Sequence, residues 1–158
     1  MKTEKATFAM GCFWSPQLLF DKIPGVLKTV VGFMGGREIF KAPSYKIVCT
    51  GITHHAEIVQ IEFDSKKISY KKLLDIFWQN HNPTTKNRQG FDIGSQYRSV
   101  IFYHNAKQKK EAEKSKEENQ KNFDRPIVTE IVKASEFYPA EDYHQKYLEK
   151  RGMQSCHI

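Results

Sequence analysis

The segment at residues 10–17, MGCFWSPQ, places a cysteine between a glycine and two large aromatic residues. The apolar run KATFAM before it predicts a strand, and Ser15 and Pro16 after it predict a helix start with Ser15 as the N-cap. The sulfur of Cys12 would then lie near the positive end of the helix dipole, which favours the thiolate. A thiolate is a nucleophile, so this spacing indicates nucleophilic or redox chemistry at Cys12.

Phe13 and Trp14, directly after the cysteine, would offer an apolar wall for a small hydrophobic group of a substrate. The same residue types also suit a buried structural cysteine among core aromatics. Cys49, inside KIVCTG among branched apolar residues, is the better candidate for that inert role. The local composition around Cys12 therefore leaves both a catalytic and a structural thiol open.

A cysteine hydrolase is one alternative, because it also uses an activated thiol, with a histidine as the base. Such an enzyme would acylate Cys12, whereas a redox enzyme would oxidise it. A zinc-binding module is a weaker alternative, since paired cysteines or histidines at the usual ligand spacing do not occur in the sequence. We therefore expect no metal. The candidate bases of a hydrolase are His54, His55, His81, His104 and His144.

Length and composition describe the chain that must position these groups. With 158 residues it has the size of one domain, and we expect a single domain over residues 1–158. Three cysteines are too few for a disulfide framework. No apolar run approaches the ~20 residues that cross a bilayer, and MKTEKATFAM lacks the apolar stretch of a secretory signal. We expect a monomer in the cytoplasm, without a membrane partner.

The formal net charge of +7 raises the question of a nucleic-acid partner. Residues 105–123 mix both signs at helical spacing, which is typical of a solvated helix face. The segment AEIVQIEF at 56–63 lacks aromatic residues at the positions where RNA-recognition strands stack bases. We therefore expect no nucleic-acid partner.

The apolar periodicity between residues 5 and 104 predicts strand, helix, strand, strand, helix and strand. This order is the split βαβ of a ferredoxin-like two-layer sandwich, an α+β fold. Extra C-terminal helices and one short added strand are expected after it, followed by a tail at residues 151–158. The expected strands are at 5–10, 28–34, 56–63, 98–104 and 128–135, and the expected helices begin at Ser15 or span 69–80, 105–123 and 140–150.

Several segments of the sequence resemble those of the A-type peptide methionine sulfoxide reductases, in the same order. They are GCFW, GFMGG, PSYKIVCTG, HHAEIVQIEFD, LLDIFWQNHNPTT, RQGFDIGSQYRSVIF and FYPAEDYHQKYLEK, which together cover nearly the whole chain. The resemblance implies reduction of the S epimer of methionine sulfoxide, free or in proteins, and hence repair of oxidised proteins. It also implies thioredoxin as the electron donor and no metal or organic cofactor.

The resemblance assigns catalytic roles to four residues. Cys12 matches the nucleophile that attacks the sulfoxide sulfur. Glu57 matches the proton donor, and a carboxyl group walled by aromatic residues would have the raised pKa that this role requires. Tyr45 and Tyr97 match two phenols that hydrogen-bond the sulfoxide oxygen and help to hold developing charge.

The resemblance also implies which residues surround the substrate. Phe13 and Trp14 match the hydrophobic wall around the methyl group of the substrate, and Asp92 matches an acidic residue of the polar pocket. His144 and Tyr147, in YHQKY, match a pair near the site. These five residues are the expected substrate-binding set.

Recycling of the thiol requires a second cysteine. Attack by Cys12 leaves a sulfenic acid, which has to be returned to the thiol. Cys156, in the tail RGMQSCHI, matches the family's resolving cysteine by its distance from YHQKY, with Gly152 as a swivel. The resemblance therefore implies a Cys12–Cys156 disulfide as the species that thioredoxin reduces.

The chain departs from the family pattern at several positions. Ser15 and Gln17 stand where the family commonly has glycine and glutamate, His54 stands where glycine is common, and Ser155 replaces a frequent aromatic residue. The segment REIFKAPS is also longer than expected. Loss of a carboxylate at Gln17 should favour the thiolate at Cys12, because a like charge is removed. We expect substrate access or preference to differ near these positions.

Overall fold

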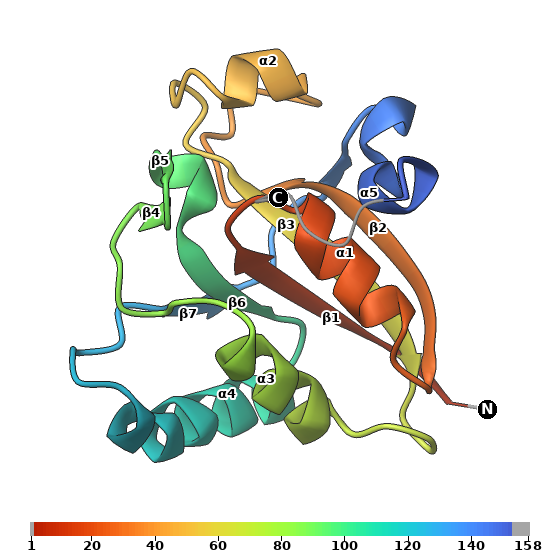
Figure 1. Cartoon of the computed structure of the whole chain (residues 1–158), viewed down its shortest axis with the longest axis vertical. Coiled ribbons are helices and arrows are strands. Elements are labelled where there is room, and N and C mark those ends of the chain that lie inside the picture. Colours follow the sequence, from red (N-terminus) through yellow and green to blue (C-terminus); the bar gives the residue numbers. More distant parts are fainter. Residues whose placement is uncertain (1, 153–158) are drawn as a thin grey trace.

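A six-stranded sheet runs through the molecule in the order β7-β6-β1-β3-β2-β8, with a separate hairpin, β4-β5 (Figure 1). The computed structural model describes residues 2–152. Neighbouring strands of the sheet are antiparallel except β6 and β7, which are parallel. The strands are β1 Thr3–Met10, β2 Val26–Met34, β3 Ala56–Asp64, β4 Arg88–Gln89, β5 Asp92–Ile93, β6 Ser99–Tyr103, β7 Glu130–Lys133 and β8 Tyr138–Pro139.

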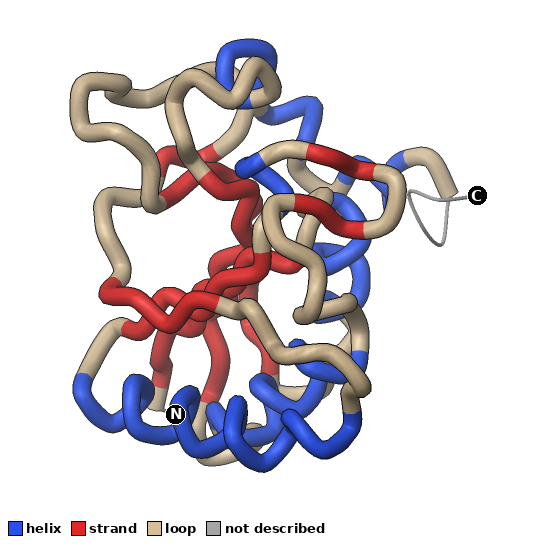
Figure 2. The backbone as a smooth tube through the Cα atoms, turned by 90° about the vertical axis from the view of Figure 1, so that its left-hand side faces the viewer, coloured by secondary structure: helices blue, strands red, loops and turns tan. Residues whose placement is uncertain are grey.

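Two longer helices, α3 (Tyr70–Gln79) and α4 (Ala106–Asn119), pack on each other at the end of the molecule opposite α2 (Tyr45–Val48), as Figures 1 and 2 show. Ser69 caps α3 and Asn105 caps α4, because each side-chain oxygen accepts a backbone N–H from the first turn. The remaining elements are the helices α1 (Trp14–Asp21) and α5 (Tyr147–Lys150) and the 3₁₀ turns η1 (Ser95–Tyr97), η2 (Gln120–Asn122) and η3 (Asp142–His144).

An aromatic core holds β1 against the helices. The ring centroid of Phe8 in β1 lies 5.9 Å from that of Phe20 in α1 and 5.0 Å from that of Phe77 in α3. All three side chains are fully buried, which stabilises the fold by roughly 1.5–3 kcal/mol for each. Both helices therefore cover the same face of the sheet, and both pack against β1.

The sheet brings four strand ends together at one edge of the molecule. Met10, at the end of β1, pairs with Ser99 at the start of β6, and Phe33, near the end of β2, pairs with Glu57 near the start of β3. The connections that leave these strand ends therefore lie close to one another. Those connections are residues 11–13, 35–55 and 94–98.

The α+β class predicted from the sequence is confirmed, but two details of the helix predictions are wrong. Helix α1 begins at Trp14 and has no side-chain cap, so Ser15 is not the N-cap. The helix starts early because Gly11, at a φ of 91°, turns the chain directly into it. The helix predicted over 140–150 is reduced to α5 and η3, because Lys146 has a left-handed φ of 58° and interrupts it.

The smaller elements differ in other ways from the expectation. The short strand predicted at 128–135 is present as β7, whereas β8 and the hairpin β4-β5 were not predicted. The two-residue strand β8 forms the edge of the sheet beside β2. The predicted resolving residue Cys156 and its neighbour Ser155 lie outside the described residues.

Candidate active site

Cys12 lies in the turn between β1 and α1. The strand ends at Met10, and the helix begins two residues after Cys12. Gln89 of β4 packs so closely on Gly11 that an added Cβ would lie 2.8 Å from two of its side-chain carbons. Glycine is therefore required at this position by both its φ and the space available. The Cys12 thiol is half-buried beside the N-terminus of α1, where the helix dipole favours a thiolate.

Glu57 brings a buried carboxyl group to the same turn. Its side chain comes from β3 and has no exposure to solvent. Its Oε1 accepts a hydrogen bond of 3.2 Å from the backbone N–H of Phe13, the residue directly after Cys12. Full burial disfavours the ionised form of a carboxyl group, so this position suits an acid that can release a proton.

Tyr45 is held at the start of α2. Ser44 caps this short helix by accepting the backbone N–H of Ile47 at 3.3 Å, and the backbone N–H of Tyr45 donates to Glu141 Oε1 at 3.2 Å. Burial raises the pKa of Tyr45 far above its usual range, and the negative charge of Glu57 raises it further. The phenol therefore stays protonated and able to donate a hydrogen bond.

Tyr97 approaches the site from η1. Burial raises its pKa far above the usual range, and the next causes are the negative charges of Glu57, Cys49 and Asp92. The charge of Cys12 contributes as well. Tyr97 is thus a second protonated phenol close to the predicted nucleophile and to the predicted acid. Asp92, half-buried in β5, lies near enough to act on it electrostatically, as expected for a residue of the polar pocket.

The prediction that Cys49 is buried is wrong, whereas its role as an inert thiol stays a prediction. Cys49 is half-buried and follows α2 as its C-cap residue. Burial raises the pKa of its thiol, whereas hydrogen bonds with the side chains of Tyr45 and Tyr97 lower it in part. The apolar residues around it in the sequence hid these contacts. The available signal was its spacing of four residues from Tyr45, which puts both side chains on one face of a helical turn.

The aromatic wall is formed mainly by Trp14. The rings of Trp14 and Tyr147 stack with a centroid distance of 3.8 Å and an interplanar angle of 9°. Trp14 is half-buried, whereas Phe13 is buried and packs 5.7 Å from Phe33 and 6.0 Å from Tyr45. Phe13 therefore supports the wall from the core side, and Trp14 is the ring that a ligand can reach.

His144 orients this wall. Its Nδ1 accepts a hydrogen bond of 3.1 Å from the indole N–H of Trp14, and its ring lies 4.2 Å from that of Tyr45. Burial lowers the pKa of His144, so the ring is neutral, with its proton on Nε2. Both contacts fix the rings of Trp14 and Tyr45 relative to each other.

Two glutamines dock the C-terminal segment onto β2 and α1. Gln145 donates from Nε2 to the carbonyl oxygen of Val31 at 2.9 Å and accepts the N–H of Val31 at 3.0 Å. The buried side chain of Gln17 accepts the N–H of Lys146 at 2.7 Å and donates to the carbonyl oxygen of Thr29 at 3.3 Å. A glutamate at position 17 could not donate this second hydrogen bond. Gln17 thus helps to place the two residues of YHQKY that reach the site.

Three other histidines proposed as hydrolase bases have structural contacts. His81 donates to the carbonyl oxygen of Phe77 and bonds Ser99 Oγ, and burial lowers its pKa to about 4. His104 bonds Thr7 Oγ1 at 2.8 Å. His54 is exposed and adopts a φ of 59°, a conformation that favours glycine and costs about 1 kcal/mol or more for other residues. These contacts do not involve Cys12.

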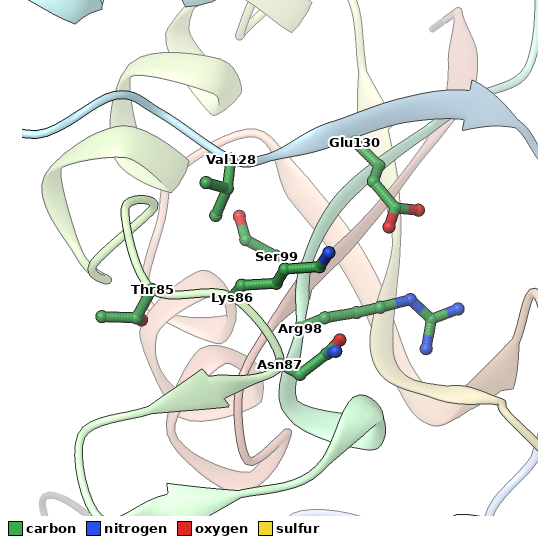
Figure 3. Close-up of a pocket in the computed structure, with 7 residues that line it drawn as sticks. All are labelled: Thr85, Lys86, Asn87, Arg98, Ser99, Val128 and Glu130. Carbon is green, nitrogen blue, oxygen red and sulfur yellow. The ribbon is translucent and has the colours of Figure 1, made fainter.

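A cavity of about 230 Å³ is lined by Thr85, Lys86, Asn87, Arg98, Ser99, Val128 and Glu130 (Figure 3). Lys86, Arg98 and Glu130 bring charges of both signs into it. Within residues 2–152, no group of three or more His, Cys, Asp or Glu side chains is arranged to hold a metal ion. In the same part of the chain, the helices are too short or too polar to cross a bilayer.

The sequence-predicted residues are brought together at one end of the sheet, with Cys156 as the exception because it lies outside residues 2–152. A thiol at a helix N-terminus, a buried carboxyl group and two protonated phenols would suit a thiol-dependent enzyme that protonates an oxygen of its substrate. The chain belongs to the peptide methionine sulfoxide reductase family, because the model of that family matches residues 4–158.

Individual relatives agree with this membership. A peptide methionine sulfoxide reductase MsrA from Methanosarcina acetivorans is 60% identical over 151 residues, which are 94% of this chain and 79% of the relative. The reduced form of Mxr1 from Saccharomyces cerevisiae has a TM-score of 0.92 at 40% identity and covers 96% of this chain and 87% of its own. Methionine sulfoxide reductase A of Corynebacterium diphtheriae also has a TM-score of 0.92, at 36% identity, covering 98% of this chain and 78% of its own.

Proposed function

We propose that this protein reduces the S epimer of methionine sulfoxide, free or in proteins, to methionine, and thereby repairs oxidised proteins. Family membership and the printed names of the relatives support the reaction class. The observation that carries the proposal is the contact of 3.2 Å between buried Glu57 and the N–H of Phe13, because it fixes an acid beside the Cys12 nucleophile.

In the first step the Cys12 thiolate attacks the sulfoxide sulfur, and Glu57 protonates the oxygen. The phenol hydroxyls of Tyr45 and Tyr97 donate hydrogen bonds to that oxygen while charge builds on it. The oxygen passes formally to the cysteine, so methionine leaves with its sulfur reduced and Cys12 becomes a sulfenic acid. Trp14 contacts the methyl group of the substrate and sets the orientation of its sulfur.

In the second step the thiol of Cys156 attacks the sulfenic acid. Water leaves with the oxygen, and a Cys12–Cys156 disulfide forms. A solved structure shows Mxr1 of Saccharomyces cerevisiae in complex with Trx2, with a TM-score of 0.66 and 27% identity to this chain over 92% of it. We extend this pairing to the present protein: a thioredoxin dithiol reduces the disulfide and is itself oxidised.

The finer architecture is part of the same proposal. The strand order β6-β1-β3-β2, with α1 and α3 on one face, supports a ferredoxin-like split βαβ core. Residues 1–158 would form one domain, with 151–158 as the tail that carries the resolving cysteine. A cytoplasmic location fits this chemistry, because reduced thiols persist in a reducing compartment.

A thioredoxin-coupled assay with separated epimers tests the function. We expect turnover of the S epimer, whereas turnover of the R epimer alone would contradict the assignment. Mass spectrometry after addition of substrate separates the proposal from a cysteine hydrolase. Loss of two hydrogens as a disulfide supports the reductase, and a mass gain from an acyl group on Cys12 supports the hydrolase.

Substitution Cys156→Ser separates chemistry from recycling. We expect the variant to convert one equivalent of methionine sulfoxide and then to lose thioredoxin-dependent turnover, because the disulfide cannot form. A small dithiol should restore much of the rate by attacking the sulfenic acid directly. Undiminished thioredoxin turnover, or a substrate-induced disulfide that includes Cys49, would show that the resolving cysteine is another one.

A further inference from the structure

The hairpin β4-β5 presents two large apolar side chains to solvent. Gly90 and Phe91 form its turn, with Gly90 at a φ of 60°, as the first position of a type II′ turn requires. Phe91 is 94% exposed and Ile93 is 72% exposed. Exposed apolar groups this close together on a short hairpin are unfavourable in water, so they indicate a surface that is covered during function.

The hairpin borders the Cys12 turn. Gln89, at its base, packs directly against Gly11, and Asp92 acts electrostatically on Tyr97. The N–H of Tyr97 in turn donates to the carbonyl oxygen of Gly94 at 3.0 Å. Figure 1 shows β4 and β5 at the same end of the molecule as α2, which carries the other phenol.

The hairpin is also fixed in position. The side-chain amide of Gln89 bonds both the N–H of Asn82 (2.7 Å) and its carbonyl oxygen (2.8 Å). The N–H of Gly94 donates to the carbonyl oxygen of Asn87 at 2.9 Å. The backbone that carries the two apolar side chains is therefore anchored next to the Cys12 turn.

A peptide that delivers a methionine to Cys12 comes close to the hairpin β4-β5. Residues of an extended chain are spaced by about 3.3 Å, so the neighbours one or two positions from the methionine remain within about 7 Å of it along the chain. A free amino acid has no such neighbours. The hairpin is thus placed to contact the residues that flank an oxidised methionine and not the sulfoxide itself.

We propose that Phe91 and Ile93 form an apolar subsite for side chains that flank the oxidised methionine, so that peptides with apolar flanking residues are preferred. The inference rests on the proposed function, since it concerns the substrate of the same site. Methionine is an apolar residue that is often buried, so its sequence neighbours are often apolar as well. Such segments become extended and accessible only when the protein that carries them unfolds.

Two blocked pentapeptides with a central methionine S-sulfoxide test the subsite, one with leucine and one with serine at the four flanking positions. Dithiothreitol serves as the reductant, so that thioredoxin binding does not enter the measurement. We expect wild type to use the leucine peptide with a kcat/KM about three- to tenfold higher. In the double variant Phe91→Ser/Ile93→Ser this ratio should fall to about one.

Leu27→Ser is the matched control, because Leu27 is also exposed, at 45%, but lies on β2 near the end of the sheet opposite Cys12. It should keep the wild-type ratio. A general loss of stability in the double variant would lower kcat/KM for both peptides alike and leave their ratio intact, so the ratio isolates the subsite.

Three outcomes overturn the inference. They are equal use of both peptides by wild type, an unchanged ratio in the double variant, and a double variant whose only change is a higher KM for thioredoxin with a small blocked sulfoxide as substrate. The last would assign the hairpin to the reductant. Failure of wild type to reduce even that small sulfoxide would instead contradict the proposed function, so the two failures are distinguishable.

Discussion

Cys12 and Cys49 are two half-buried thiols near the same acid and the same phenol, yet their backbone positions are opposite. Cys12 precedes a helix of eight residues, whereas Cys49 ends one of four. The positive end of a helix dipole favours a thiolate, and the negative end disfavours it. At Cys49 burial raises the thiol pKa further. The place of the two cysteines relative to their helices therefore favours Cys12 as the nucleophile.

The different helix positions of Cys12 and Cys49 also suggest different roles for the two thiols in one site. In the proposed reaction Cys12 attacks the substrate, whereas the hydrogen bonds of Cys49 with Tyr45 and Tyr97 would help to place these two phenols. We therefore propose that Cys12 is the reactive thiol and that Cys49 is a positioning thiol. Replacing each cysteine separately by serine tests this division of roles.

The largest effect is expected from Cys12→Ser. Sulfoxide reduction should fall on the order of 10³-fold or more, because a serine hydroxyl is neither ionised near neutral pH nor able to form the disulfide. The measurement is single-turnover methionine formation, with circular dichroism as the control for folding. Substantial turnover in this variant, together with a disulfide between Cys49 and Cys156, would make Cys49 the nucleophile.

Glu57→Gln should have the next largest effect. We expect sulfenic acid formation to be slowed about 10²–10⁴-fold, the usual range for loss of general-acid help. Glu62→Gln, on the same strand but half-buried, is the matched control and should stay near the wild-type rate. The wild-type rate needs a protonated Glu57 and an ionised Cys12, so it should pass through a maximum with pH. A flat pH profile would contradict this pairing.

Alkylation by iodoacetamide compares the two thiols directly. At pH 7 we expect Cys12 to be modified at least tenfold faster than Cys49, as resolved by peptide mass spectrometry. The raised pKa of Cys49 means that its thiolate fraction grows about tenfold with each pH unit below that pKa, so its rate should still climb through pH 9. A rate for Cys49 that levels off below pH 9 would contradict the raised pKa of its thiol.

The smallest effect is expected at Cys49 itself. Cys49→Ser keeps a hydrogen-bonding group and should retain most of the activity, whereas Cys49→Val leaves the two phenols without their partner. We expect the valine variant to lose about three- to tenfold in kcat with little change in KM, because the phenols act mainly on charge that develops in the transition state. Equal activity of both variants would show that Cys49 does not position the phenols.

The sequence was informative about the fold where periodicity is strong. The strands around Phe8 and Phe63 and the helix around Phe77 follow from their apolar periodicity, because their apolar residues form the core. It was less informative where tertiary contacts replace local signals. The edge strand β8 is two residues long and depends on pairing with β2, and the interruption at Lys146 depends on the docking of Gln17 and Gln145.

In the site, too, features with local signals could be predicted from the sequence, whereas features that depend on tertiary contacts could not. The place of Cys12 between a strand and a helix made it a candidate, since both signals are local, but did not separate a catalytic from a structural thiol. Glu57 could not be distinguished from a solvated residue of an alternating strand, because its burial comes from elements distant in the chain. Only the resemblance to a family identified it. The partial exposure of Cys49 was missed for the complementary reason, since its local apolar neighbours do not reveal the two phenols near it.

By itself the sequence determined the α+β class, the strand ends that carry reactive groups and the family motifs, because these depend on residue types a few positions apart. Tertiary structure decided the proximity of Glu57 to Cys12, the stacking of Tyr147 on Trp14 and the exposure of Phe91 beside the catalytic turn. The physical reason is that burial, and with it the protonation of acids and phenols, depends on packing between segments far apart in the chain.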